Sequence, residues 1–202
     1  MVAQESLELF VMVRIHAGQP TNSSATHNLR IKRAAMQKRI KFFTTGGTID
    51  KVYFDAKSEF EVGPPQVLEI LKDAHVMMEY EIESILRKDS LDMTEQDRQL
   101  VRQRAEAEKC RWIIVTHGTD TMVQTARALT GIPGKTIVLT GSMQPARFRV
   151  TDAVFNIGTA VGAVQSLAPG VYIVMNGQVF DPSYTRKNLD RNCFEEVSGK
   201  ER

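Results

Sequence analysis

Residues 40–47 read Ile-Lys-Phe-Phe-Thr-Thr-Gly-Gly, a short apolar run that ends in two hydroxyls and two glycines. The run at 40–44 has the length of a buried strand, and Thr-Gly-Gly is typical of a strand that enters a tight turn. Two later apolar runs, at 112–115 and 136–139, are followed by Thr-His-Gly-Thr and by Thr-Gly. The sequence therefore predicts buried strands whose carboxyl ends carry small polar residues.

Helical patterns alternate with these strands along the chain. Helices are predicted over 66–73, 94–109, 121–129 and 152–165, and two more strands over 77–85 and 171–175. Thr94 followed by acids marks the start of the second helix. Strands and helices that alternate at this spacing favour a mostly parallel sheet with helices on both faces. We expect a three-layer α/β fold with a doubly wound, mostly parallel sheet, in a single domain over 36–195.

Composition limits the class of protein. The chain has 202 residues, of which 42% are hydrophobic and 25% charged, and this is ordinary for one globular domain. No run approaches the roughly 18 apolar residues of a membrane span, so no membrane association is expected. Two cysteines are too few for a disulfide framework or a structural zinc cluster.

The first 35 residues differ from the rest of the chain. They carry four basic and two acidic side chains, which account for the whole net charge of +2, and they show no sustained periodicity. Residues 36–202 are neutral, so no excess charge is available for nucleic acid. Residues 1–35 lack the basic start and the cleavage site of a secretory signal, so they match such a signal poorly. We expect 1–35 to be a disordered extension or an overlong reading that precedes a natural start at Met36, and 196–202 to be a short tail.

Ligands of such sheets bind beyond the carboxyl ends of the strands. That rule indicates three segments, 44–48, 116–121 and 140–145, all rich in Thr, Ser or Gly. A hydroxyl is a weak nucleophile that needs a neighbouring base, and Asp120 and Lys187 are candidates to assist one. Backbone N–H groups of the glycine turns could form an oxyanion hole. The alternative, at about even odds from the residues alone, is that these threonines only satisfy strand ends and turns.

Several other patterns carry less weight. Residues 131–136, Gly-Ile-Pro-Gly-Lys-Thr, end like a phosphate-binding loop, but a helix precedes them and a strand follows, which is the reverse of that motif. After Met36 the sequence has no clustered cysteines and no closely spaced pair of histidines, so a metal site is not expected. His75 is interpreted as a helix C-terminal cap, and His117 as an orienting hydrogen-bond group rather than a catalytic base.

Two motifs together resemble the signatures of the L-asparaginase/glutaminase family: Thr-Thr-Gly-Gly-Thr-Ile at 44–49 and Thr-His-Gly-Thr-Asp-Thr-Met at 116–122. The similarity continues through 89–93, 139–145, 152–156 and 174–176, and it covers about residues 38–195. The resemblance implies hydrolysis of L-asparagine to L-aspartate and ammonia without a cofactor or a metal.

The resemblance also implies site residues. Thr45 matches the primary nucleophile, and Thr119, Lys187 and Asp120 match a second Thr–Lys–Asp triad in which Asp120 also holds the substrate's α-amino group. Ser90 matches the serine that holds the α-carboxylate. The substrate-binding residues implied in full are Gly46, Asp89, Ser90, Gly118, Thr119, Asp120, Ser142 and Met143.

The sequence departs from the family pattern in three places. Phe60 stands where larger members often have the tyrosine of a mobile lid, so Tyr53 is the expected catalytic substitute. Leu91 replaces a polar residue, which could weaken substrate binding or reject glutamine. The second, C-terminal domain of usual members has no counterpart here, so the resemblance is to short, single-domain asparaginases, with homo-oligomers and a cytoplasmic location expected.

Two other functions stay open. A component of a tRNA amidotransferase carries the same motifs and would make the chain one part of a larger transamidation machine. A non-catalytic module that binds or senses an amino acid would keep the pocket without turnover.

Overall fold

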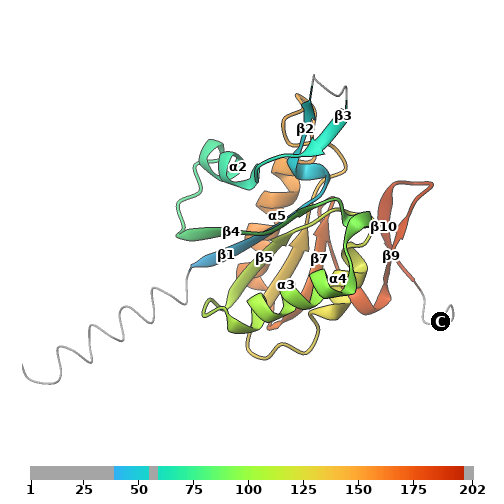
Figure 1. Ribbon diagram of the computed structural model, residues 1–202. Helices are drawn as coiled ribbons and strands as arrows, with labels where there is room; N and C mark the ends of the chain where they lie inside the picture. Colours follow the sequence, from blue (N-terminus) through green and yellow to red (C-terminus); the bar gives the residue numbers. More distant parts are fainter. Residues whose placement is uncertain (1–38, 55–58, 198–202) are drawn as a thin grey trace, which may run out of the picture. The chain divides into compact units, whose positions relative to one another are not determined.

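The computed structural model describes residues 39–54 and 59–197. The expected extension at 1–35, the start at Met36 and most of the C-terminal tail lie outside these residues. The main elements alternate as the sequence predicted (Figure 1). The strands of the main sheet are β1 (Ile40–Gly46), β4 (Tyr80–Lys88), β5 (Trp112–Thr116), β6 (Thr136–Thr140), β7 (Gly170–Met175) and β8 (Gln178–Phe180). The helices are α2 (Val67–Asp73), α3 (Glu95–Ala107), α4 (Met122–Ala128) and α5 (Ala153–Ser166).

The strand order creates one switch point. The six strands lie in the order β4-β1-β5-β6-β7-β8, with β8 antiparallel to β7 and the others parallel. The chain moves outward from β1 to β4 and then crosses to the other side of β1 to form β5. Loops that leave adjacent β1 and β5 therefore diverge, and a crevice for ligands opens at their carboxyl ends. The three segments expected to bind ligand lie at this edge.

Side chains of the strands alternate between two apolar layers. On one face, Phe43, Ile113 and Leu139 pack with residues of α3 and α4. On the other face, Phe42, Ile114 and Val138 pack with residues of α2 and α5. The expected three-layer α/β fold with a mostly parallel sheet is confirmed. Within the described residues no helix is long and apolar enough to cross a membrane.

Local signals place the helix ends. The Thr94 side chain accepts a hydrogen bond from the Asp97 N–H and the Asp97 carboxylate accepts one from the Thr94 N–H, a capping box at the start of α3. Residues 131–134 connect the end of α4 to β6 with Gly131 and Gly134 at φ of 84° and 70°. This stretch is the helix–strand turn that the sequence predicted, and not a phosphate-binding loop. His75 follows the α2 C-cap residue Ala74 and has a φ of 49°.

Some elements differ from the prediction. The strand expected over 77–85 is β4 at Tyr80–Lys88, because its pairing with β1 begins at Ile40 opposite Tyr80. The short edge strand β8 was not predicted, nor were two hairpins: β2 (Lys51–Phe54) with β3 (Glu59–Val62), and β9 (Thr185–Asn188) with β10 (Cys193–Glu196). Both are short and rich in charged residues, so neither has the apolar run that marks a buried strand. The 3-10 helices are η1 (Thr48–Asp50), η2 (Ser90–Asp92) and η3 (Pro182–Tyr184).

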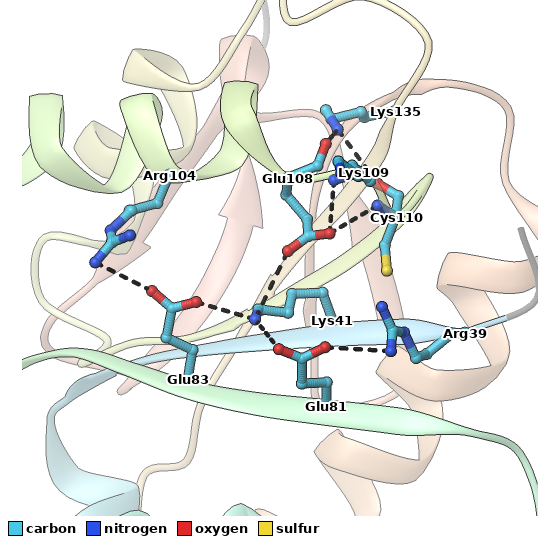
Figure 2. Close-up of polar contacts among 9 residues, drawn as sticks. All are labelled: Arg39, Lys41, Glu81, Glu83, Arg104, Glu108, Lys109, Cys110 and Lys135. Atoms are coloured by element: carbon cyan, nitrogen blue, oxygen red, sulfur yellow. Dashed lines mark hydrogen bonds and ion pairs between the residues drawn. The ribbon is translucent and has the colours of Figure 1, made fainter. Parts of the chain in front are cut away.

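A buried lysine joins three elements at the amino-terminal end of the sheet (Figure 2). Lys41 of β1 is 3% exposed, and its ammonium lies 2.7 Å from Glu81, 2.9 Å from Glu83 and 3.6 Å from Glu108. Burial lowers the pKa of Lys41, but hydrogen bonds with Glu81 and Glu83 outweigh it and leave the pKa raised. The lysine therefore stays charged, and the carboxylates compensate its burial.

Glycines let the turns after β1 and β5 touch. A Cβ at Gly47 would lie 2.4 Å from the Gly118 Cα, and Gly47 has a φ of 85°. A Cβ at Gly141 would lie 2.3 Å from the His117 carbonyl oxygen. Any other residue at Gly47 would separate the turns after β1 and β5, and any other residue at Gly141 would separate the turns after β5 and β6.

We predict that Gly47→Ala destabilises the protein much more than Gly131→Ala. The two glycines have nearly equal φ values, 85° and 84°, but nothing lies within 4 Å of a Cβ at Gly131. Gly131→Ala should cost about 1 kcal/mol for the left-handed backbone, and Gly47→Ala at least about 2 kcal/mol more, because a backbone must move. Urea unfolding of both variants measures this difference. Equal losses of stability would show that the turns do not need their close contact.

Candidate functional site

Four loops meet at the carboxyl edge of β1, β5 and β6. The Gly47 N–H donates to the Lys88 carbonyl over 3.0 Å, which joins the first turn to the end of β4. The His117 N–H donates to the Thr140 carbonyl over 2.9 Å, which joins the turns after β5 and β6. These backbone bonds bring together the three segments expected from sequence and the segment 88–92.

Thr45 lies at the end of β1 and is 1% exposed. Its hydroxyl donates to the Thr116 carbonyl of β5 over 3.0 Å. The hydroxyl proton is therefore held by the backbone in this structure, and the oxygen must exchange that partner for a base before it can attack a substrate.

Thr119, Asp120 and Lys187 form one hydrogen-bonded group. The Lys187 ammonium donates to the Thr119 Oγ over 2.7 Å and to the Asp120 carboxylate over 2.6 Å. Thr119 is 4% exposed and the Lys187 side chain 10%. Two residues of the turn after β5 thus contact a lysine that is distant in the sequence. Loss of a proton from the ammonium would leave Lys187 as a neutral amine, a base in contact with the Thr119 hydroxyl.

An arginine that sequence reasoning missed holds the segment that carries Lys187. The Arg127 guanidinium of α4 donates to the Pro182 carbonyl over 2.8 Å and to the Thr185 carbonyl over 3.3 Å. Both carbonyls lie just before Lys187 in the chain. In the sequence, Arg127 was only a basic residue in the last turn of a helix, where cations are common, so no signal distinguished it.

Asp89 and Ser90 begin η2 beside the turn after β5. The Ser90 hydroxyl is buried and has no hydrogen-bond partner among the described residues, and a Cβ at Gly118 would lie 2.5 Å from it. The Ser90 carbonyl accepts a hydrogen bond from the Thr121 hydroxyl over 2.7 Å. A buried hydroxyl without a partner is costly, so Ser90 is available to a ligand.

The Asp89 carboxylate is held in place by two donors. It accepts a hydrogen bond from the Leu91 N–H over 3.3 Å and pairs with the Lys51 ammonium at 2.7 Å. Burial raises the pKa of Asp89, but the hydrogen bond from Lys51, its charge and the backbone N–H groups outweigh that effect and leave the pKa lowered. Asp89 is therefore ionised at neutral pH.

Ser142 and Met143 follow β6 and are bound within their own turn. The Ser142 hydroxyl donates to the Gln144 carbonyl over 2.6 Å. The Met143 N–H donates to both oxygens of the Asp152 carboxylate, each at 3.0 Å. Asn156 of α5 braces the same turn, because its side chain donates to the Gly141 carbonyl over 3.0 Å and to Asp152 over 2.8 Å. Ser142 and Met143 thus shape the edge of the crevice.

Tyr53 lies on β2, apart from the groups above. It is 54% exposed, and its ring packs edge-on against Phe60 of β3 with centroids 5.4 Å apart. Phe60 in turn packs against Phe148 at 5.8 Å. Among the described residues the Tyr53 hydroxyl has no hydrogen bond to Thr45. The tip of this hairpin, residues 55–58, lies outside the described part of the chain.

His117 lies under the site and has both ring nitrogens bound. Nδ1 lies 2.7 Å from the Gly118 carbonyl and must carry the proton it donates there, so Nε2 accepts from the Thr125 hydroxyl at 2.8 Å. Burial lowers the pKa of His117 to about 4, against a smaller raising effect of the Gly118 hydrogen bond. His117 is neutral at physiological pH and orients its turn, in agreement with its interpretation from sequence.

Asp50, buried at the end of η1, was missed by sequence reasoning. Its carboxylate accepts a hydrogen bond from the Gln66 N–H over 2.8 Å, and its carbonyl accepts one from the Gly63 N–H. Burial raises the pKa of Asp50 to about 7, although the Gln66 N–H and Arg87 act in the opposite direction. Among the described residues, no three of the His, Cys, Asp and Glu side chains are grouped to hold a metal ion.

We predict opposite effects of His117 and Asp50 on the pH dependence of stability. With a native pKa of about 4, His117 binds fewer protons folded than unfolded, so its contribution falls, by about 3 kcal/mol, as pH drops from 6.5 to 4. With a native pKa of about 7, Asp50 contributes stability at low pH that is lost as pH rises from about 4 through 7. Urea unfolding across this range should show less acid loss for His117→Gln and less loss at rising pH for Asp50→Asn. Profiles parallel to that of the parent would contradict both assignments.

Comparisons with known proteins agree with this arrangement. A family model described as "Asparaginase, N-terminal" matches residues 39–199. The L-asparaginase of Thermococcus kodakarensis is 33% identical over 91 residues, which are 43% of this chain and 28% of that protein. A glutamyl-tRNA(Gln) amidotransferase component from Methanococcus vannielii is 28% identical over 182 residues, which are 81% of this chain and 40% of that protein.

Solved structures share the fold at similar identity. The thermostable L-asparaginase from Thermococcus kodakarensis superposes on this chain with a TM-score of 0.67 at 27% identity. The superposition covers 79% of this chain and 51% of the solved one. A probable cytoplasmic L-asparaginase from Campylobacter jejuni gives 0.65 at 25% identity, with the same coverage of 79% and 51%. The chain thus spans less than half the length of these two sequence relatives and about half of the solved chains. With a family match over nearly all the described residues, and with both signature turns at the switch point of the sheet, the chain belongs to the asparaginase family of amidohydrolases.

Proposed function

We propose that the protein hydrolyses the side-chain amide of L-asparagine to give L-aspartate and ammonia. The observation that carries this proposal is the Lys187 ammonium in contact with both Thr119 and Asp120, at the edge of the sheet that also holds Thr45. Such a group can exchange protons with a reacting hydroxyl or a leaving amine. The relatives named L-asparaginase and glutaminase-asparaginase support the choice of substrate.

The proposed reaction is acyl transfer through a threonine ester. The Thr45 oxygen attacks the amide carbon and loses its proton to Tyr53 or to the Thr119–Lys187 pair, while the carbonyl oxygen becomes an oxyanion. Backbone N–H groups of the glycine turns, at Gly46 and Gly118, stabilise that charge. The C–N bond then breaks, and the nitrogen leaves as ammonia after it receives the proton that Thr45 gave up. Water adds to the ester, and its cleavage returns a proton to Thr45 and releases aspartate.

The substrate's two α groups would bind on either side of Thr119. The unpartnered hydroxyl of Ser90 is proposed to donate to the α-carboxylate, and the Asp120 carboxylate to accept from the α-amino group. Asp89, Ser142 and Met143 would complete the pocket wall. Tyr53 would have to approach Thr45 to act, because among the described residues its hydroxyl has no hydrogen bond to Thr45 and its exposed ring packs against Phe60 of the same hairpin.

A second candidate follows from the length of one match. The amidotransferase component from Methanococcus vannielii aligns with 81% of this chain, which is more than the L-asparaginase of Thermococcus kodakarensis does. The same amide chemistry would then supply ammonia to a partner protein, with glutamine as an alternative donor. An isolated chain that releases ammonia from asparagine in the absence of other proteins would exclude this role as its main function. A module that binds an amino acid without turnover is the third candidate.

We predict that Thr45→Ala and Lys187→Met each reduce ammonia release from asparagine by about 100-fold or more, because they remove the nucleophile or its proton carrier. Thr159→Ala, at a half-buried position of α5, and Lys72→Met, at an exposed position of α2, serve as matched controls and should keep parent activity. A coupled ammonia assay with asparagine and glutamine measures these rates. Tight binding of aspartate by a parent protein without turnover would favour the binding module, and near-normal turnover of Lys187→Met would remove the triad from the mechanism.

Association and location are part of the same proposal. Homo-oligomers and a small-molecule substrate as the main partner are proposed from the family resemblance, and a cytoplasmic location agrees with the solved neighbour named a probable cytoplasmic L-asparaginase. Light scattering of the purified protein measures the oligomeric state, and a monomer at working concentration would contradict the first of these points.

A further inference from the structure

One ion pair joins the β2–β3 hairpin to the segment that holds Ser90. Lys51, the first residue of β2, places its ammonium 2.7 Å from the Asp89 carboxylate, with 29% and 27% of the two side chains exposed. Asp89 directly precedes Ser90 in the chain, so the ion pair lies beside the pocket proposed for the substrate's α-carboxylate.

Asp89 is fixed where it would oppose an anionic ligand. Its carboxylate caps η2 by accepting from the Leu91 N–H, and it precedes the buried, unpartnered hydroxyl of Ser90. A substrate carboxylate bound to Ser90 would therefore meet a second negative charge on the preceding residue of the chain, and like charges repel more strongly where water is partly excluded.

The cations near Asp89 have other partners. The Arg98 guanidinium of α3, which like Asp89 interacts electrostatically with His117, lies 3.7 Å from the Glu95 carboxylate. The ammonium of Lys88, the residue before Asp89, lies 2.8 Å from the Asp97 carboxylate of α3. His117, which lies behind the Ser90 segment, is neutral because burial lowers its pKa to about 4. Among the described residues, Lys51 is thus the cation paired with Asp89.

We propose that Lys51 is a specificity-determining residue, whose ammonium cancels the charge of Asp89 and so allows the pocket to bind a substrate that carries an α-carboxylate next to Ser90. This inference rests on the proposed function of the site. It assigns to the base of the hairpin a role in binding, separate from any movement of Tyr53. The alternative is that the pair only anchors the hairpin, in which case its loss would affect all substrates alike.

The experiment compares L-asparagine with its α-amide, L-aspartic acid diamide, in which a neutral carboxamide of similar size replaces the charged α-carboxylate. For Lys51→Met, KM for asparagine should rise about tenfold with kcat within about twofold, and KM for the diamide should stay near the parent value. Lys51→Arg, which keeps the charge, should restore the parent KM. Adding Asp89→Asn to Lys51→Met should lower the asparagine KM again, because no charge then remains to be cancelled.

Lys72→Met is the control, since it removes the lysine of an exposed lysine–glutamate pair on α2. An equal rise of KM for both substrates in Lys51→Met, or no response to Asp89→Asn, would overturn the proposal. Calorimetric binding of L-aspartate separates this outcome from failure of the proposed function. A parent protein that binds aspartate without turnover, and loses about tenfold in affinity on Lys51→Met, would contradict hydrolysis and support the role of Lys51; unchanged affinity would overturn that role.

Discussion

The turns after β1 and β5 touch backbone to backbone, and each part of the site is placed relative to that contact. Adjacent parallel strands bring their carboxyl ends to one edge, but only residues without a side chain allow the two turns to approach as closely as Gly47 and Gly118 do. This approach sets the position of Thr45 relative to Thr119. It also places Ser90 against Gly118, so the groups proposed to bind and to attack the substrate share one rigid backbone framework.

Buried polar groups then keep this framework in a single arrangement. His117 is bound through both ring nitrogens below one turn, and Asn156 with Asp152 holds the turn after β6. Such networks are stable only when their members are satisfied, and they make a loop rigid when they are. Three buried hydroxyls in this region, those of Thr44, Thr116 and Ser90, have no hydrogen-bond partner among the described residues, and that of Ser90 lies against Gly118, where the ligand is proposed to bind.

Much of the fold follows from patterns that a short window of sequence contains. The apolar runs ahead of Thr45 and Thr119 and the capping box at Thr94 are local signals, so the main strands and helices were placed to within a few residues. The hairpins at 51–62 and 185–196 were missed because charged residues face solvent there and tertiary contacts, such as those of Arg127, hold them. Physical reasoning indicated hydroxyls at the strand ends, but the pairing of Lys187 with Thr119 depended on the family resemblance. The roles of Lys51 and Asp50 depend on burial and on partners distant in sequence, which no local pattern reveals.

Lys187 follows both Thr45 and Thr119 in the chain, and this order has a consequence for biosynthesis. Ribosomes make the chain from its amino terminus, and domains generally fold as units as they emerge. The nucleophile candidate Thr45 and the turn with Thr119 leave the ribosome well before the β9–β10 hairpin that supplies the amine. A nascent chain can thus form most of the sheet while Thr119 still lacks its lysine partner, so the Thr119–Asp120–Lys187 group is completed only after residue 187 has emerged.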